Sequence, residues 1–183
     1  NTFRFIAHPC YYTVEDYLKS NRDNERVARV TYENSGNTIN EGPAVMKHNG
    51  KYYLSFSVNS YGTSDYQIGQ AVADSPLGPF RKLTEEEGGL LLSALAVESQ
   101  PAGEASTQAP SGTGHHSFVT AGNQTFIVYH RHRDYETAGA DRYTAIDEIK
   151  WIKNKDGLDV MYANGPTDSV QPLPETYSKY KNI

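Results

Sequence analysis

The fold class is decided by one stretch of sequence, Ala44-Val45-Met46-Lys47-His48-Asn49-Gly50-Lys51-Tyr52-Tyr53-Leu54-Ser55-Phe56-Ser57-Val58. Its Asn-Gly pair separates two alternating apolar runs, which is the strongest short-range signal of a β-hairpin. Two more strands are predicted at residues 66–72 and 80–83, the second after a Pro-rich turn at residues 76–79. Together these strands predict a four-stranded antiparallel meander, which is the size of one propeller blade.

The same pattern occurs a second time further along the chain. Residues 117–120 and 125–130 repeat the hairpin around a turn at residues 121–123, and further strands are predicted around residues 142–151 and 158–162. The matched pairs lie a constant 73 positions apart (124 − 51) and are Lys51 with Gln124, Tyr53 with Phe126 and Phe56 with Tyr129. Repeated blades around an axis make a β-propeller, which needs roughly four to eight blades to close. The sequence therefore predicts an all-β fold and an incomplete ring.

This pattern divides the chain into five segments of one propeller domain. Residues 1–37 are expected to form a partial blade or a connection, and residues 38–92 a blade. Residues 93–114 lack periodicity and are predicted to be a long loop, residues 115–165 a second blade, and residues 166–183 a tail that closes the ring.

Composition and charge narrow the range of partners. The 183 residues include 14 Tyr and 6 Phe but only 2 Met, which favours strands. The net charge of −5 leaves no excess of basic residues to bind phosphates, so nucleic acid and anionic membranes are excluded as expected partners. The sequence contains no run of about 18 apolar residues, which a membrane-spanning helix would need. Neutral substrates remain possible.

Three further features concern processing and location. The chain begins without Met or a signal-peptide pattern, so we expect a processed chain. Its one cysteine, Cys10, could be a buried thiol or form a bridge to another chain, and a buried thiol is expected as the commoner case. Asn123-Gln124-Thr125 fits the N-glycosylation pattern at a predicted turn, which favours a secreted, extracellular protein.

Polar residues that could carry chemistry stand where each predicted blade begins. Glu41 precedes Gly42-Pro43 at the start of the first blade, and His115 and His116 stand at the corresponding place in the second. Neighbours in a strand point to opposite faces, so only one of the two histidines can face the central channel, and we expect this to be His115. A lone histidine does not make a zinc site. Each of these residues could also be an ordinary surface residue, as could the alternating His and Arg residues of the run 129–133.

The ordered set of motifs resembles glycoside hydrolase family 43 over roughly residues 38–165. The resemblance rests on Asn40-Glu41-Gly42-Pro43-Ala44-Val45, Asn49-Gly50-Lys51-Tyr52-Tyr53-Leu54-Ser55-Phe56-Ser57, Asp74-Ser75-Pro76-Leu77-Gly78-Pro79-Phe80, Gly112-Thr113-Gly114-His115-His116-Ser117 and Val128-Tyr129-His130. This family implies a five-bladed β-propeller, of which the chain would supply about the last three blades. It also implies inverting hydrolysis of arabinan, arabinoxylan or xylo-oligosaccharides by an Asp base, an Asp that tunes the acid, and a Glu acid before Gly-Pro.

The resemblance also assigns roles to individual residues. Glu41 matches the general acid, and His115 matches a histidine near the axis that is often linked to a calcium ion. Asn40 and Arg142 are expected to bind substrate, Arg142 as a weaker match to an arginine of the last blade. His116 stands where the family commonly has Gly or Asn, and we expect it to add a substrate contact.

The family's two aspartates have no counterpart in this sequence, because they lie upstream of the Glu-Gly-Pro motif. Inverting hydrolysis needs two carboxyl groups, one to protonate the leaving oxygen and one to activate water. The chain alone is therefore expected to be inactive and to need an N-terminal fragment or chain that carries the first blades. With that part we expect an α-L-arabinofuranosidase that acts on arabinan or arabinoxylan.

Two alternatives remain open at this point. The chain could be a non-catalytic carbohydrate-binding propeller module, for which a shallow groove with an aromatic floor is expected rather than a deep pocket on the axis. It could also belong to a β-xylosidase, endo-arabinanase or galactanase of the same family.

Overall fold

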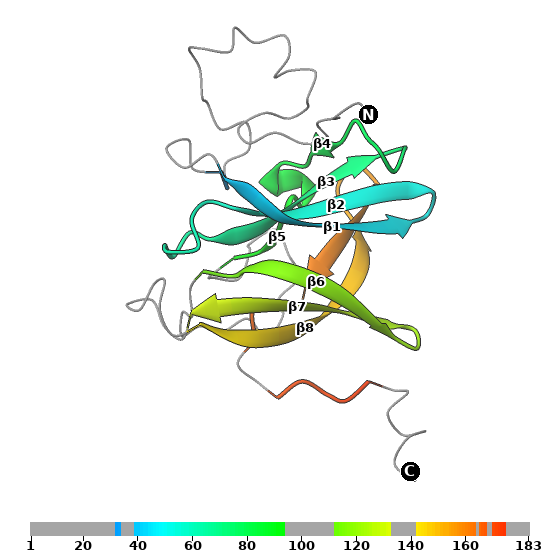
Figure 1. Ribbon diagram of the computed structural model, residues 1–183. Coiled ribbons are helices and arrows are strands. Elements are labelled where there is room, and N and C mark those ends of the chain that lie inside the picture. The colour runs from blue at the N-terminus through cyan, green and yellow to red at the C-terminus, as the bar shows by residue number, and fades with distance from the viewer. Residues whose placement is uncertain are drawn as a thin grey trace, which may run out of the picture.

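The computed structural model describes residues 32–33, 39–93, 112–132, 142–163, 165–167 and 170–174. Within these residues the chain is built almost entirely from β-strands, which confirms the predicted all-β fold (Figure 1). Cys10, most of the predicted partial blade and the middle of the predicted loop lie outside the described residues. No helix in the described part has the length and apolar character needed to cross a membrane.

The first blade is an antiparallel sheet in the order β1-β2-β3-β4, with the added strand β5 paired to β3. Its strands are β1 (Asn40–His48), β2 (Lys51–Val58), β3 (Gln67–Ala73), β4 (Arg81–Lys82) and β5 (Leu90–Leu92). The sequence pattern did not predict β5 or the short 3₁₀ helix η1 (Glu85–Glu87) before it. Three leucines are too few to show a period, and η1 is a single turn that begins with a capping box from Thr84 to Glu87.

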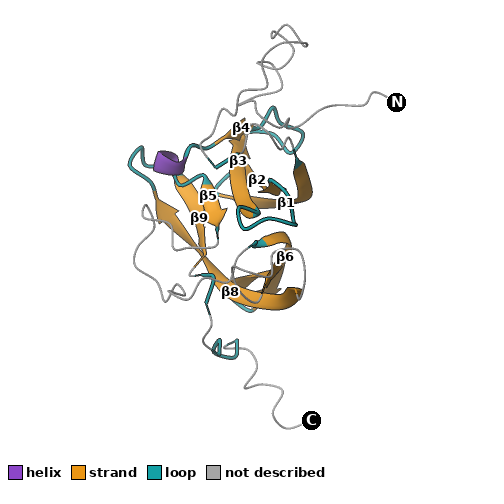
Figure 2. Cartoon of the chain, turned by 90° about the vertical axis from the view of Figure 1, so that its left-hand side faces the viewer, coloured by secondary structure: helices purple, strands orange, loops and turns teal. Residues whose placement is uncertain are grey.

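The second blade is a four-stranded antiparallel sheet in the order β6-β7-β8-β9. Its strands are β6 (Gly114–Ala121), β7 (Gln124–His132), β8 (Arg142–Lys153) and β9 (Asp159–Ala163). All four lie where the repeat in the sequence predicts them. In Figure 2 the two blades face each other, with β9 beside β5.

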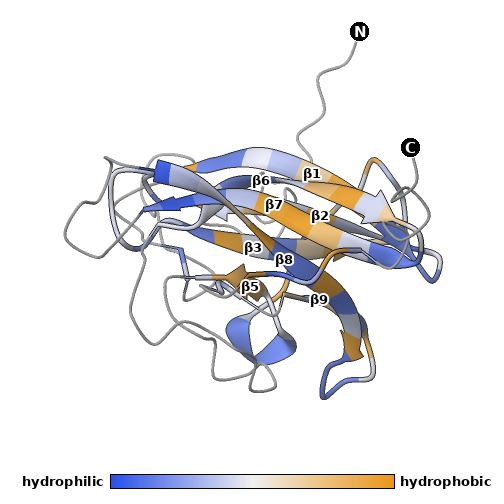
Figure 3. Cartoon of the chain, turned by 90° about the horizontal axis from the view of Figure 1, so that it is seen from below, coloured by the Kyte–Doolittle hydropathy of each residue, from blue (hydrophilic) through white to orange (hydrophobic). Residues whose placement is uncertain are grey.

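An apolar core fills the space between the blades. Tyr53 and Ile68 of the first blade pack there against Ile127, Tyr129 and Met161 of the second. Hydrophobic segments accordingly run along the strands in Figure 3, whereas η1 is hydrophilic.

A second cluster covers the opposite face of the first blade and includes Phe56, Leu54 and Tyr32. Phe56 thus lies on the face that turns away from the second blade, and Tyr129 lies on the corresponding face of its own blade, toward the first. The matched residues of the repeat therefore occupy equivalent places, as expected for neighbouring blades of a propeller.

The first strands of both blades share one irregularity. β1 has a β-bulge between Glu41 and Ala44, and β6 has one between Gly114 and Ser117, again 73 positions apart (114 − 41). The residue inside each bulge has a left-handed backbone, Gly42 with φ 55° and His115 with φ 49°. Bulges bend a strand and re-aim its side chains, and they are common beside active sites.

The blades are also joined at the hairpin end of β1 and β2 by a group of side chains that we call the blade clasp. The ring of His48 stacks on Trp151 of β8, with centroids 3.9 Å apart, and Tyr53 meets the same indole edge-on at 4.7 Å. Asn49 Nδ2 donates to Asp159 Oδ2 across the blades (2.7 Å), and the Tyr53 hydroxyl donates to the Asp159 carbonyl oxygen (2.5 Å). This clasp lies at the end of β1 opposite to Glu41.

Candidate active site

The antiparallel order of the two blades gathers a set of polar residues at one end of the strands. Glu41 is the second residue of β1 and pairs with Ser57 near the end of β2, whereas His130 near the end of β7 pairs with Gly114 at the start of β6. Arg142 begins β8 and pairs with the last residue of β7. The bulges of β1 and β6 bring these strand ends together, because a Cβ added at Gly42 would lie 3.3 Å from the Cα atom of His115.

Glu41 is held in this site by a hydrogen bond to a tyrosine. The half-buried carboxyl group of Glu41 accepts a hydrogen bond at Oε1 from the hydroxyl group of Tyr66, at 2.7 Å. Tyr66 lies just before β3 and is fully buried. Gly114 makes room for it, because a Cβ at that position would overlap the Tyr66 ring. Glu41 is thus fixed by a side chain that cannot swing away into solvent.

Tyr66 in turn is connected to the second blade. The backbone N–H of His115 donates to Ser57 Oγ at 2.7 Å, and the Ser57 side chain hydrogen-bonds to the hydroxyl group of Tyr66. Burial raises the pKa of Tyr66, the Ser57 hydrogen bond opposes that change, and Glu41 adds to it. The phenol is therefore a neutral donor at all ordinary pH values.

Two histidines and an arginine form the other side of the site. His130 stacks against Tyr66 at 5.8 Å and against His115 at 6.3 Å between ring centroids. Arg142 Nη1 lies 3.3 Å from His130 Nε2, and its guanidinium group lies 5.0 Å from the ring centroid of the exposed Tyr61. Burial, followed by the charge of Arg142, lowers the pKa of His130 to about 4. A neutral His130 can accept the hydrogen bond from Arg142.

The structure separates the two adjacent histidines, as the strand alternation predicts. His115 is exposed at the strand ends, whereas His116 is buried between the blades with 6% of its surface accessible. The ring of His116 hydrogen-bonds to Ser55 Oγ at 2.6 Å and meets Phe118 edge-on. Burial lowers the pKa of His116 to about 4. This position gives no support to the predicted substrate contact, because the ring is enclosed by the core between the blades.

Asn40, also predicted to bind substrate, takes part in an internal polar cluster. Its Oδ1 accepts a hydrogen bond from Lys82 Nζ at 2.9 Å, and its Nδ2 donates to Glu33 Oε1 at 3.0 Å. Lys82 and Glu33 are both buried and form an ion pair with each other. The cluster anchors Asn40, which precedes Glu41 in the chain, so Asn40 is placed to support the position of Glu41.

The residues at the end of β7 are not the solvated strand end that remained open as an interpretation. Arg131 is 3% exposed and His132 is fully buried, and the Arg131 guanidinium group lies 5.1 Å from the Tyr143 ring centroid.

The predicted calcium ion finds little support from the described side chains. Calcium takes six to eight oxygen ligands, and the groups around His115 are mainly imidazoles and a guanidinium. In the described part of the chain, no three His, Cys, Asp or Glu side chains come close enough together to hold a metal ion. These residues do not fit calcium on their own, and we derive no chemical step through a metal.

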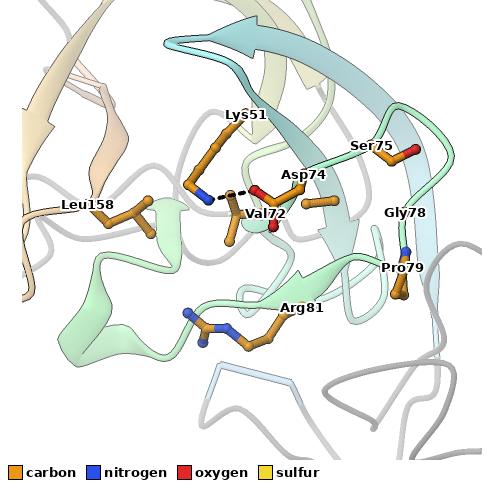
Figure 4. A pocket seen from close by; sticks show the side chains of 9 residues that line it. Lys51, Val72, Asp74, Ser75, Gly78, Pro79, Arg81 and Leu158 are labelled. Atoms are coloured by element: carbon orange, nitrogen blue, oxygen red, sulfur yellow. Dashed lines mark hydrogen bonds and ion pairs between the residues drawn. The ribbon is translucent and has the colours of Figure 1, made fainter.

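A cavity of about 370 Å³ lies elsewhere, at the hairpin end of the first blade (Figure 4). Lys51, Arg81 and Leu158 line it, and Lys51 forms an ion pair with Asp74 at 2.7 Å. Because this cavity lies at the far end of β2 from Ser57, it is not the predicted axial pocket.

The sequence interpretation missed Tyr66 and Ser57 and left His130 open. The strand order of an antiparallel meander could have identified these residues. In an antiparallel meander, the end of the second strand and the start of the third lie at the same edge as the start of the first. Residues 57–66 are therefore bound to lie beside Glu41, and the end of β7 lies beside His115 for the same reason.

Comparisons with known proteins agree with this geometry. The model of the family "Glycosyl hydrolases family 43" matches residues 13–158. A β-D-galactofuranosidase from Aspergillus niger is 36% identical over 110 residues, which cover 60% of this chain and 28% of that protein. An extracellular exo-α-(1→5)-L-arabinofuranosidase from Streptomyces avermitilis is 30% identical over 139 residues, covering 70% of this chain and 26% of that protein.

A solved structure supports the same conclusion. The crystal structure of a thermostable family-43 glycoside hydrolase is 36% identical, with a TM-score of 0.59, and the match covers 79% of this chain and 42% of that one. The chain thus spans about a quarter of the length of these two curated relatives. The solved relatives are five-bladed β-propellers, of which this chain supplies only a part. Fold, motifs and the family model agree, and the chain belongs to glycosyl hydrolases family 43.

Proposed function

We propose that this chain supplies the general-acid part of an inverting α-L-arabinofuranosidase that acts on arabinan or arabinoxylan. The observation that carries the proposal is Glu41, which stands at a bulged strand start, hydrogen-bonded to buried Tyr66 and beside His115. A half-buried carboxyl group held in one orientation is what proton transfer to a leaving oxygen needs.

The proposed chemistry divides between this chain and the rest of the ring. The Glu41 carboxyl group gives its proton to the glycosidic oxygen as the bond to the sugar breaks. A second carboxylate, on the N-terminal blades, takes a proton from water, which attacks the opposite face of the sugar ring. The groups gathered around Glu41 are a phenol, imidazoles and a guanidinium, so the second carboxylate is expected from that partner fragment or chain.

Arg142 and Tyr61 are proposed to contact substrate. Arg142 is exposed at the start of β8, and Tyr61 keeps 52% of its surface accessible while one face meets the guanidinium group. An aromatic face that is half free suits the apolar face of a sugar ring, and a guanidinium group suits its hydroxyl groups.

An extracellular location is part of the proposal. The Streptomyces avermitilis relative is described as extracellular. Asn123 is exposed in the turn between β6 and β7, where a glycan could be attached. A calcium ion near His115 stays a prediction, and its oxygen ligands would have to come from water or from the other blades.

A second candidate activity is β-D-galactofuranosidase, because the relative from Aspergillus niger with that name is 36% identical. Arabinofuranose and galactofuranose both have five-membered rings, and galactofuranose carries one carbon more. The two activities are distinguished by the ratio of kcat/KM on the p-nitrophenyl glycosides of the two sugars. A pocket wall that excludes one extra carbon changes that ratio by about 10- to 200-fold.

Substitution of Glu41 tests the proposed role. In the complete propeller, Glu41→Gln keeps the shape of the side chain but removes the transferable proton. We expect kcat/KM on arabinan, which has a poor leaving group, to fall by about 10²- to 10⁴-fold. Activity on an activated aryl arabinofuranoside, which needs little protonation, is expected to change much less. The measurement is a kinetic comparison of the two substrates.

The matched control is Glu86→Gln, which makes the same change at an exposed carboxylate on η1, where it forms an ion pair with Lys155. This variant is expected to keep its activity on both substrates. Unchanged arabinan hydrolysis by Glu41→Gln would contradict the acid role and would favour a non-catalytic carbohydrate-binding module.

A further inference from the structure

A line of hydrogen bonds runs from the second blade to Glu41. It starts at the backbone N–H of His115, which donates to Ser57 Oγ at 2.7 Å. It continues through the hydrogen bond between the Ser57 and Tyr66 hydroxyl groups and ends where the Tyr66 hydroxyl donates to Glu41 Oε1 at 2.7 Å. We call these four groups the donor line.

The direction of the donor line is fixed at its start. A backbone N–H can only donate, so Ser57 Oγ accepts at that bond and is free to donate its own proton onward. Tyr66 is thereby left with its proton for Glu41. Hydrogen bonds that point the same way along a chain strengthen one another.

The donor line is enclosed for most of its length. Ser57 and Tyr66 are both fully buried, so water cannot replace either hydroxyl group. Its starting point is fixed as well, because His115 sits in the bulge of β6 with a left-handed backbone and lies against Gly42. The orientation of Glu41 in the first blade is therefore coupled to the backbone of the second.

We propose that Tyr66 is a positioning residue for Glu41, and that the donor line from His115 through Ser57 sets the orientation of that carboxyl group. This inference rests on the proposed acid role of Glu41. A general acid must lie within hydrogen-bond reach of the leaving oxygen. Tyr66 therefore favours the orientation of the Glu41 carboxyl group in which proton transfer can occur.

The test compares kcat/KM on arabinan and on an activated aryl arabinofuranoside for the complete propeller carrying Tyr66→Phe, which removes only the hydroxyl group. We expect kcat/KM on arabinan to fall by about 10- to 100-fold, the effect of losing a hydrogen bond to a charged group. Activity on the aryl substrate, which needs little protonation, is expected to change much less. Ser57→Ala, which breaks the line one step earlier, is expected to show the same difference between the substrates with a smaller loss.

The matched control is Tyr53→Phe. Tyr53 is also buried and donates to a carbonyl oxygen, but it lies in the blade clasp at the other end of the strands. Tyr53→Phe is expected to lose stability with no difference between the two substrates. A purely structural role for Tyr66 predicts the same for Tyr66→Phe, so equal changes on both substrates would overturn the inference.

The Glu41→Gln variant separates the two proposals. If it loses arabinan hydrolysis while Tyr66→Phe keeps its activity on arabinan, the acid role stands and the donor line is wrong. If Glu41→Gln keeps full activity, the acid role fails and the donor line fails with it. In the expected case, adding Tyr66→Phe to Glu41→Gln causes little further loss, because both changes act through one carboxyl group.

Discussion

At the scale of single residues, the backbone of His115 is the unusual feature. A left-handed conformation costs a residue with a side chain about 1–2 kcal/mol, which is why glycine occupies the equivalent position 42. Strained residues of this kind are typical of functional sites. The second blade keeps a histidine there, and its exposed ring faces the strand ends where Glu41 lies. We infer that the ring, rather than the strand geometry, accounts for the side chain at this position.

His115→Gly separates the cost of the left-handed backbone from the contribution of the histidine ring. The substitution removes the left-handed strain but keeps the backbone N–H that donates to Ser57. Despite the loss of a whole side chain, we expect the free energy of unfolding to stay unchanged or to rise by up to about 1 kcal/mol. Chemical denaturation measures it.

The matched control is Thr120→Gly on the same strand. Thr120 is exposed, and it is not among the described residues with positive φ, so glycine there is expected to destabilise by about 1 kcal/mol. Equal losses in the two variants would contradict the interpretation of His115 as strained.

The sequence predicts some of these residues better than others. Glu41 and His115 can be found because each follows or precedes glycine at a strand start, and strand alternation predicts that the two adjacent histidines point to opposite faces. Tyr66 cannot be found from a motif, because its role depends on a hydrogen bond between two strands. The buried position of His116 depends on Ser55 of the other blade, a contact that no local pattern contains.

At the scale of the elements, the blades are predicted well where strands are long and turns are distinctive. The Asn-Gly turn fixes β1 and β2, and the offset of 73 then locates β6 and β7. The bulges were not predicted, since one extra residue against the partner strand leaves no mark on the apolar alternation. Contacts between the blades, such as the blade clasp, join residues about 100 positions apart and are also beyond local patterns.

Removal of Trp151 tests how far the blade clasp holds the two sheets together. Trp151→Ala removes the stack on His48 and the edge contact with Tyr53. Because the indole is only half-buried, we expect a loss of about 2–4 kcal/mol in the free energy of unfolding, somewhat less than for a core tryptophan. Thermal and chemical unfolding provide the measurement.

Leu77→Ala is the control for this prediction. Leu77 is a large apolar residue in a turn and is 60% exposed, so its removal is expected to change stability by no more than about 0.5 kcal/mol. If Trp151→Ala lowered the free energy of unfolding by no more than this control, the blade clasp would contribute little to stability.

At the scale of the whole molecule, the second blade has an outer face that keeps exposed apolar side chains. Val119 is 46% exposed and Ile146 is 40% exposed. A blade in a closed propeller is covered on both faces, and the family's propeller has five blades, of which this structure describes two. The exposed face of β6 and β8 is where we expect the ring to continue.

This expectation leads to a complementation experiment. The chain on its own is expected to release no arabinose from arabinan, because inverting hydrolysis needs a second carboxyl group. Adding the N-terminal blades, expressed separately or joined in one chain, should restore hydrolysis. Ile146→Glu should weaken the restored hydrolysis, because it places a charge in the contact between the second blade and the added blades. Glu86→Gln should not weaken it. Full activity of the isolated chain would show that the base lies within it.

The blade clasp also provides a built-in optical probe. Trp151 is the only tryptophan in the sequence, and His48 from the other blade lies flat against it. A stacked imidazole, above all when protonated, quenches indole emission, so separation of the blades should brighten the protein and shift its emission to the red. Intrinsic fluorescence can therefore follow the opening and assembly of the ring in real time, without a label and independently of any sugar.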